Sequence, residues 1–200
     1  MPLKNEIRSI DHVVIAETRG EGDSKTLVLR GHAAVFNRLS HNLGGFREKI
    51  APGAFDKVMD NDVRAVFNHD INMVLGRSSA GTLRLSTDDE GLAYEIDLPN
   101  TSYARDLHES VKRGDIKENS FKFSVMRDSW AYDDETGGEI RTIEEVARLM
   151  DVGPVAFPAY PDATIAQRSL EDWKQANRAT VEGSEKLRKM KFDLLRKQLD

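Results

Sequence analysis

The strongest local pattern in the chain is an alternation of residue types that follows a glycine-containing turn. Over residues 119–125, Phe121 and Phe123 share one parity, whereas Ser120 and Lys122 fall on the other. A period of two residues predicts a β-strand with one buried face. A chain organised around such short segments is restricted to a fold that consists mainly of β-sheet, and Ser120 is expected at the entrance of a strand.

Other short apolar segments are separated by clusters of turn-forming residues. We predict further strands in these segments, at residues 5–19, 26–36, 46–50, 62–67, 81–87, 92–98 and 141–157. A helix is predicted from Thr101 or Ser102, as N-cap, to about Arg113, where Gly114 ends it. A shorter helix is expected after Pro52. The pattern therefore predicts an antiparallel sheet or barrel with helices packed on it.

The composition changes near residue 165. Residues 169–200 contain eight Lys/Arg and six Asp/Glu, a net charge of +2, so the rest of the chain carries −5 − 2 = −7. Leu187, Met190 and Leu194 follow helical spacing. We predict one globular domain over residues 1–166 and a helical or flexible tail over 167–200. A tail that packs on a partner and a solvated appendage are both compatible with this pattern.

The overall composition excludes several classes of protein. A length of 200 residues suits one domain, and a net charge of −5 disfavours a nucleic-acid partner. The chain has no cysteine, which excludes disulfides, thiolate metal sites and a cysteine nucleophile. Neither a secretory segment nor a run of about 18 apolar residues occurs. We expect a soluble intracellular protein without a membrane partner.

A serine nucleophile needs a neighbouring base, and the base needs an orienting group. Among the five histidines, His69 follows an apolar strand and is flanked by Asn68 and Asp70, whereas His108 lies on the predicted helix and is expected to be exposed. Taken alone, His69 is more often structural or simply exposed, and Ser120 is more often a small residue beside two aromatic rings. The residues by themselves leave these alternatives open.

Candidate acids lie in the C-terminal part of the predicted domain. Asp151 falls inside an apolar run, where an unpaired carboxylate would be costly, and Glu144 and Glu145 precede it. The histidines do not cluster at ligand spacing, no His-Glu-x-x-His motif occurs, and no phosphate-binding loop is present. We therefore predict neither a metal nor a cofactor.

Six short segments, taken together and in order, resemble the prohead proteases of tailed bacteriophages. They are residues 31–36, 50–55, 67–70 with 75–77, 81–85, 112–115 with 119–123, and 149–161. The resemblance covers roughly residues 28–166. It departs from the family pattern at Lys122, where a small residue is common, and at Gly153-Pro154.

The resemblance implies an α+β, mainly β fold: an antiparallel β-barrel ringed by helices, similar to the herpesvirus maturation protease assemblin. It also implies His69 as general base and Ser120 as nucleophile. Asp151 becomes the third catalytic residue, and Glu145 is the reserve for that position.

The implied activity is that of a serine endopeptidase acting inside the assembling prohead, in the host cytoplasm. Its implied substrates are the major capsid protein and the scaffold. Self-cleavage that removes the tail is also implied, and the analogy with assemblin implies a homodimer. One alternative is a catalytically silent capsid-assembly or scaffold-type module with the same fold. Another is an unrelated β-barrel binding domain in which Ser120 and His69 never meet.

Overall fold

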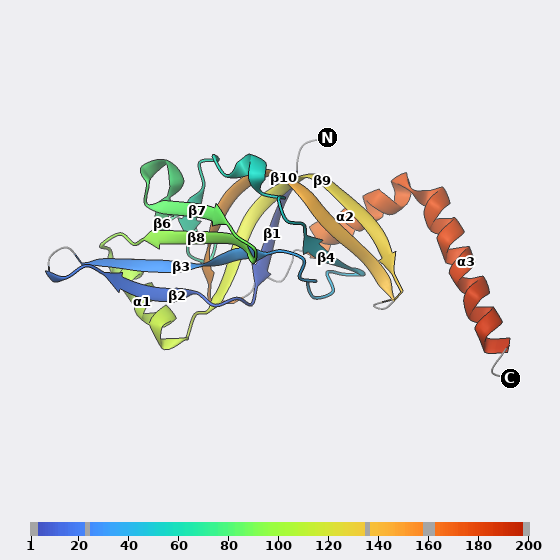
Figure 1. Cartoon of the computed structure of the whole chain (residues 1–200), viewed down its shortest axis with the longest axis horizontal. Helices are drawn as coiled ribbons and strands as arrows, with labels where there is room; N and C mark the ends of the chain where they lie inside the picture. Colours follow the sequence, from blue (N-terminus) through green and yellow to red (C-terminus); the bar gives the residue numbers. More distant parts are fainter. Residues whose placement is uncertain (1–3, 23–24, 135–136, 158–162, 198–200) are drawn as a thin grey trace.

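The computed structural model describes residues 4–22, 25–134, 137–157 and 163–197. Pro158 to Pro161, which belong to the last segment of the resemblance, lie outside them. Two β-sheets form the body, and two helices follow at the C-terminus (Figure 1). The elements are β1 Asn5–Ile10, β2 Ile15–Arg19, β3 Thr26–Val35, β4 Phe46–Ile50, η2 Asp56–Val58, β5 Arg64–Val66, β6 Val74–Arg77, η3 Ser78–Ala80, β7 Leu83–Thr87, β8 Gly91–Asp97, α1 Ser102–Arg113, β9 Glu118–Asp133, β10 Gly138–Val155, α2 Ala163–Ala176 and α3 Arg178–Lys197.

The strands form two open sheets within the described residues. The larger sheet has the order β1-β9-β10-β5-β6, with β4 also paired to β10, and the smaller sheet has the order β2-β3-β8-β7. β10 pairs in parallel with β4 near its start and with β5 near its end. Among the residues described, one isolated bridge, from Phe36 to Ile50, joins the sheets. The mainly β expectation is confirmed, but the closed barrel is wrong, because two separate strands share one edge of β10 and the remaining edges do not meet.

The core confirms the predicted burial of Phe121 and Phe123, but the expectation of a single buried face is wrong, because Ser120 and Ser124 on the other face are buried as well. Phe121 and Phe123 are fully buried and stack with ring centroids 4.6 Å apart. Phe55, which precedes the short helix η2, meets Phe121 edge-on at 5.9 Å. These rings lie between the sheets, so the backbone that carries Ser120 is supported by close-packed aromatic side chains.

The helix α1 has the predicted ends. Gly114 adopts a left-handed φ of 83° at its C-cap, and the Gly114 N–H donates to the carbonyls of Ser110 and Val111. The expectation that His108 is exposed is wrong: His108 is buried, and its Nε2 lies 2.8 Å from the Glu17 carbonyl oxygen. Because α1 packs against β2, the face that carries His108 is covered.

A buried cluster of charges attaches the edge strand β1 to the rest of the larger sheet. Arg8 Nε lies 2.8 Å from Glu48 Oε1, and Arg141 Nη1 lies 2.8 Å from Glu6 Oε2 and 2.9 Å from Glu48 Oε2. Burial raises the pKa of Glu6, but the neighbouring Arg141 and Arg8 charges outweigh it, so this pKa lies below its usual value. The carboxylate therefore stays ionised inside the protein.

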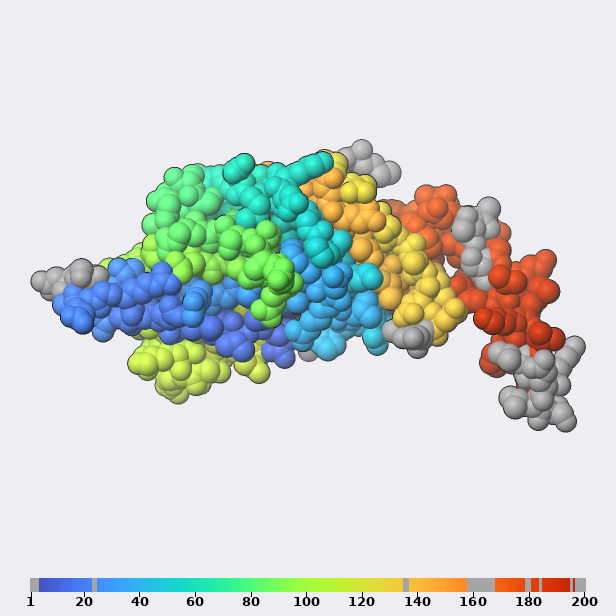
Figure 2. All heavy atoms as spheres, viewed as in Figure 1, coloured from blue at the N-terminus to red at the C-terminus, as the bar shows by residue number. Residues whose placement is uncertain are grey.

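The C-terminal helices differ in how they contact the body. Leu170 of α2 is buried against Leu43 and Phe46, and Trp173 stacks on Trp130 with centroids 5.5 Å apart. In contrast, α3 runs past the end of the sheets (Figure 1, Figure 2) and touches β9 through Arg188, whose guanidinium carbon lies 3.5 Å from the centroid of the Tyr132 ring. It leaves apolar side chains exposed at Leu187, Met190, Phe192 and Leu194. Among the described helices, none is both long and apolar enough to span a membrane.

Candidate active site

Three side chains predicted from the sequence meet at one end of the larger sheet. His69 Nε2 lies 2.6 Å from Ser120 Oγ, and His69 Nδ1 lies 2.6 Å from Asp151 Oδ1. The side chains of His69 and Asp151 are only 14% and 15% exposed. The reserve acid Glu145 instead pairs with Lys57 at 2.9 Å. The arrangement therefore contains a hydroxyl, an imidazole and a carboxylate in hydrogen-bonded order.

The backbone that presents His69 is unusual. Asn68 and His69 both have left-handed φ values, 54° and 58°, which non-glycine residues rarely adopt. Two contacts hold this turn against the end of β10: the Asn68 N–H donates to the Pro154 carbonyl at 3.1 Å, and Asn68 Oδ1 accepts from the Ala156 N–H at 2.8 Å. Backbone strain of this kind is concentrated at functional sites, where surrounding contacts maintain it.

A β-bulge determines the direction of Asp151. The pairing of β10 with β9 shifts between Leu149, which lies opposite Phe123, and Asp151, which lies opposite Lys122. Without the shift, Asp151 would share the core-facing parity of Leu149. The extra residue moves the carboxylate to the face of Ser120, where it meets His69. This explains how an acidic residue fits within an apolar run.

Gly153 allows the strands that carry the site to approach closely. It lies opposite Ser120 in the register of β9 and β10. A Cβ atom at this position would lie 2.2 Å from the Val66 carbonyl oxygen, far inside contact distance. Only glycine therefore permits β5 to lie this near to β10, and the end of β5 leads directly into the His69 turn.

The Ser120 hydroxyl is covered by β1. Ser9 lies opposite Ser120 in the antiparallel pair, and Ser120 is fully buried. Ser120 Oγ lies 2.9 Å from the Arg8 carbonyl oxygen. The Ser9 hydroxyl donates a hydrogen bond to Ser120 Oγ at 3.2 Å. Because Ser120 has a single hydroxyl proton, donation to Arg8 competes with donation to His69.

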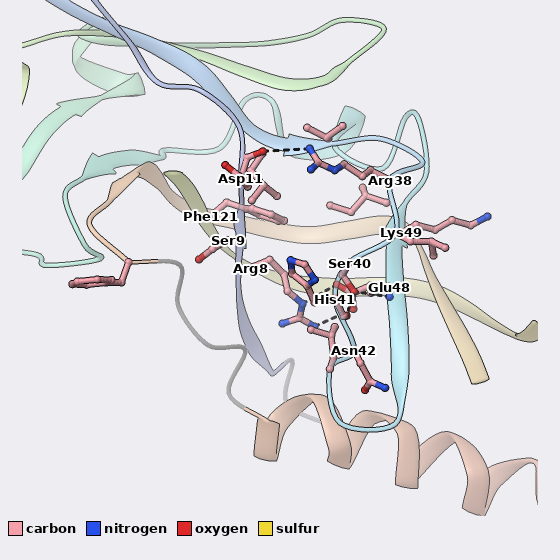
Figure 3. A pocket seen from close by; sticks show the side chains of 16 residues that line it. Arg8, Ser9, Asp11, Arg38, Ser40, His41, Asn42, Glu48, Lys49 and Phe121 are labelled. Carbon is pink, nitrogen blue, oxygen red and sulfur yellow. Dashed lines mark hydrogen bonds and ion pairs between the residues drawn. The ribbon is translucent and has the colours of Figure 1, made fainter. Parts of the chain in front are cut away.

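A pocket of about 540 Å³ lies beside β1, and Arg8, Ser9 and Ile10 are among the residues that line it. Figure 3 shows Arg8, His41 and Glu48 grouped in it, while the side chain of Ser9 points away. Phe121 lines the pocket but Ser120 does not. Successive residues of a strand point to opposite faces, so this pocket does not open onto the hydroxyl.

A family model for the caudovirus prohead serine protease matches residues 14–176. The chain therefore belongs to this family, the class of phage serine proteases that act in capsid maturation. Among solved structures, the capsid assembly protease gp21 of bacteriophage T4 aligns with a TM-score of 0.49 and 11% identity, covering 78% of this chain and 98% of that chain. No curated protein matches the chain.

Proposed function

We propose that the protein is a serine endopeptidase that cleaves scaffold protein, capsid protein or both inside the prohead in the host cytoplasm. Ser120 is the nucleophile, His69 the general base and Asp151 the group that orients His69. The observation that carries this assignment is the continuous series of two 2.6 Å contacts from Asp151 through His69 to Ser120. Family membership supports the reaction class independently.

The geometry suits acyl transfer. Ser120 Oγ attacks the carbonyl carbon of the scissile peptide while His69 Nε2 accepts the hydroxyl proton. His69 then gives this proton to the leaving amine, and an acyl-enzyme ester remains. Water attacks the ester with the same base, releasing the acid and regenerating Ser120. Asp151 accepts a hydrogen bond from Nδ1–H throughout, which selects the reactive tautomer and stabilises the imidazolium.

Attack requires a change at β1. Ser120 is fully buried and its hydroxyl contacts Arg8 and Ser9 of β1, so a substrate carbonyl carbon cannot reach it in the present arrangement. Displacement of this segment would expose Ser120 and would also remove the acceptor that competes with His69 for the hydroxyl proton. Substrate therefore gains access when the Arg8–Ser9 segment moves away from Oγ.

Self-cleavage, removal of the tail at 167–200, and homodimer formation are further parts of the proposed function. The exposed apolar residues of α3 support a role for this segment in contacting other proteins before it is removed. Intact-mass analysis of the purified wild type and of Ser120→Ala tests self-cleavage, because only the wild type should lose residues. Light scattering at several concentrations tests the dimer.

The decisive experiment is co-expression with the cognate capsid and scaffold proteins. Wild type should cleave them, whereas Ser120→Ala and His69→Ala should lose activity by several orders of magnitude. Cleavage that persists in both variants would end the serine-protease assignment. A wild type that is folded but leaves every substrate intact would favour the catalytically silent module.

A further inference from the structure

A second cluster of titratable side chains lies outside the catalytic site. It combines His12 from the β1–β2 connection, His32 from β3, and Glu90 from the β7–β8 turn, with ligand atoms that all lie within 4.8 Å of one another. Asp88 in the same turn contacts His32. These residues are far apart in the sequence, so the absence of ligand spacing among the histidines did not reveal that His12 and His32 meet in space.

The two imidazoles face the same carboxylate. His12 Nε2 lies 2.6 Å from Glu90 Oε1, and His32 Nδ1 lies 3.7 Å from Glu90 Oε2. The ring centroids of His12 and His32 are 4.9 Å apart. Two protonated imidazoles at this distance would repel each other, whereas two neutral rings around one carboxylate form a convergent set of electron-pair donors.

Asp88 determines the orientation and tautomer of His32. Asp88 Oδ1 accepts the backbone N–H groups of Glu90 and Gly91, both at 2.9 Å, as an ionised carboxylate does. His32 Nε2, 2.9 Å from Asp88 Oδ2, is therefore the donor of that contact. In the neutral ring this leaves the lone pair on Nδ1, directed toward Glu90. A carboxylate that orients a histidine in this way is typical of metal sites.

We propose that His12, His32 and Glu90 bind a divalent transition-metal ion, with Asp88 positioning His32. Two imidazole nitrogens and one carboxylate oxygen suit Zn²⁺ and similar ions better than Mg²⁺ or Ca²⁺, which prefer oxygen ligands alone. The ion would replace the proton now shared by His12 and Glu90.

The surroundings permit entry and coordination of an ion. Bonds of about 2.0–2.2 Å around a tetrahedral ion require ligand atoms roughly 3.4 Å apart, so the present separations need only a small side-chain adjustment. The Glu90 side chain is 53% exposed and can supply this movement. The open side leaves room for water as a fourth ligand.

A bound ion would connect three segments near the catalytic strand. The carbonyl oxygen of His12 accepts a hydrogen bond from Asn119 Nδ2 at 2.6 Å, and Asn119 precedes Ser120. The ion would therefore hold the β1–β2 connection to the β7–β8 turn and support this contact. We expect binding to stabilise the folded chain by mass action.

The test uses the full chain without a histidine tag, carrying Ser120→Ala to prevent self-cleavage. Calorimetric titration with Zn²⁺ and the visible absorption of added Co²⁺ should show one bound ion, and Zn²⁺ should raise the melting temperature. Glu90→Gln and His32→Ala should weaken binding at least tenfold, and Asp88→Asn should weaken it about 10–100-fold. The matched control is Asp89→Asn, which removes a neighbouring exposed carboxylate from the same turn.

Three results would overturn the proposal. They are the absence of saturable Zn²⁺ binding, equal weakening by Asp89→Asn and Glu90→Gln, and loss of binding in His69→Ala, which would locate the ion at the catalytic site. Because the Glu90 side chain is exposed, Glu90→Gln decides the test even if a histidine variant fails to fold. Far-UV circular dichroism of each variant identifies any such failure.

Discussion

At the scale of single residues, the proposed chemistry depends on which acid faces His69. Asp151 reaches the imidazole only because the bulge after Leu149 reverses its direction. Glu145, in the same strand, pairs with Lys57 instead. The two acids therefore have different predicted effects on activity, although both lie on β10.

Replacing Asp151 with Asn should preserve the fold and reduce activity strongly. The amide keeps the shape of the carboxylate, but it no longer fixes the reactive tautomer or stabilises the imidazolium, and a loss of about 10³–10⁴-fold in kcat is expected for such a change. Cleavage rates of a capsid or scaffold peptide measure it.

Glu145→Gln is the matched control on the same strand. It should retain activity within a few-fold of the wild type, because Glu145 contacts the exposed Lys57 and Arg127, and ion pairs with exposed partners contribute little. Greater loss in Glu145→Gln than in Asp151→Asn would reverse the assignment of the third residue.

The limits of sequence reasoning are clear at this scale. Alternation predicted the burial of Phe121 and Phe123 from the residues alone, and resemblance supplied His69, Ser120 and Asp151 with Glu145 in reserve. The meeting of Asp151 with His69 depends on a bulge, which alternation does not reveal. Coverage of Ser120 by Ser9 depends on pairing between residues 111 positions apart, which no local pattern encodes.

At the scale of elements, Gly153 controls the distance between β5 and β10. Gly153→Ala would place a methyl group against the Val66 carbonyl, so the strands must separate and the His69 turn must move. We expect a loss of activity of at least 10²-fold, since misplacement of a catalytic group by about 1 Å has this effect. A lower melting temperature should accompany it.

Gly138→Ala provides the comparison, because it adds the same methyl group to the same strand where the nearest atom is 4.0 Å away. This variant should keep wild-type activity and stability. If both variants behave alike, close approach at Gly153 is not what positions His69.

The charge cluster beneath β1 gives a second prediction for an element. Arg8→Met should destabilise the protein by about 3–5 kcal/mol, because it leaves Glu6 and Glu48 buried with one cation fewer. Urea unfolding at neutral pH measures this loss. Arg47→Met, which removes an exposed arginine from β4, should cost much less.

The same cluster predicts how stability depends on pH. The folded-state pKa of Glu6 is lowered, so its contribution is present above its usual value of 4.5 and is lost as pH falls through the lower folded value. Wild type should therefore lose stability in this acidic range. Arg8→Met should lose less there, because part of the stabilisation of the ionised carboxylate is already absent; an equal loss would show that Arg8 does not sustain it.

At the scale of the whole molecule, the class of fold could be predicted but its closure could not. Short alternating segments and turn clusters identify a mainly β chain, and capping residues identify α1. Whether the sheets close into a barrel depends on pairing between strands far apart in the sequence. Here β4 and β5 share one edge of β10, and the barrel stays open. The division into a domain over 1–166 and a tail over 167–200 stays a prediction, and the packing of α2 provides a way to test it.

Two truncations distinguish the contributions of α2 and α3. A chain ending at residue 177 should melt within a few degrees of the full length, because the apolar residues of α3 are exposed. A chain ending at residue 166 also removes Leu170 and Trp173, which uncovers Phe46 and Trp130. Loss of one or two such buried side chains costs about 2–4 kcal/mol, or roughly 5–15 °C for a domain of this size. Scanning calorimetry of both truncations, with Ser120→Ala to prevent self-cleavage, measures the difference. Equal melting temperatures would show that residues 167–177 add nothing to the domain and would support a boundary at 166.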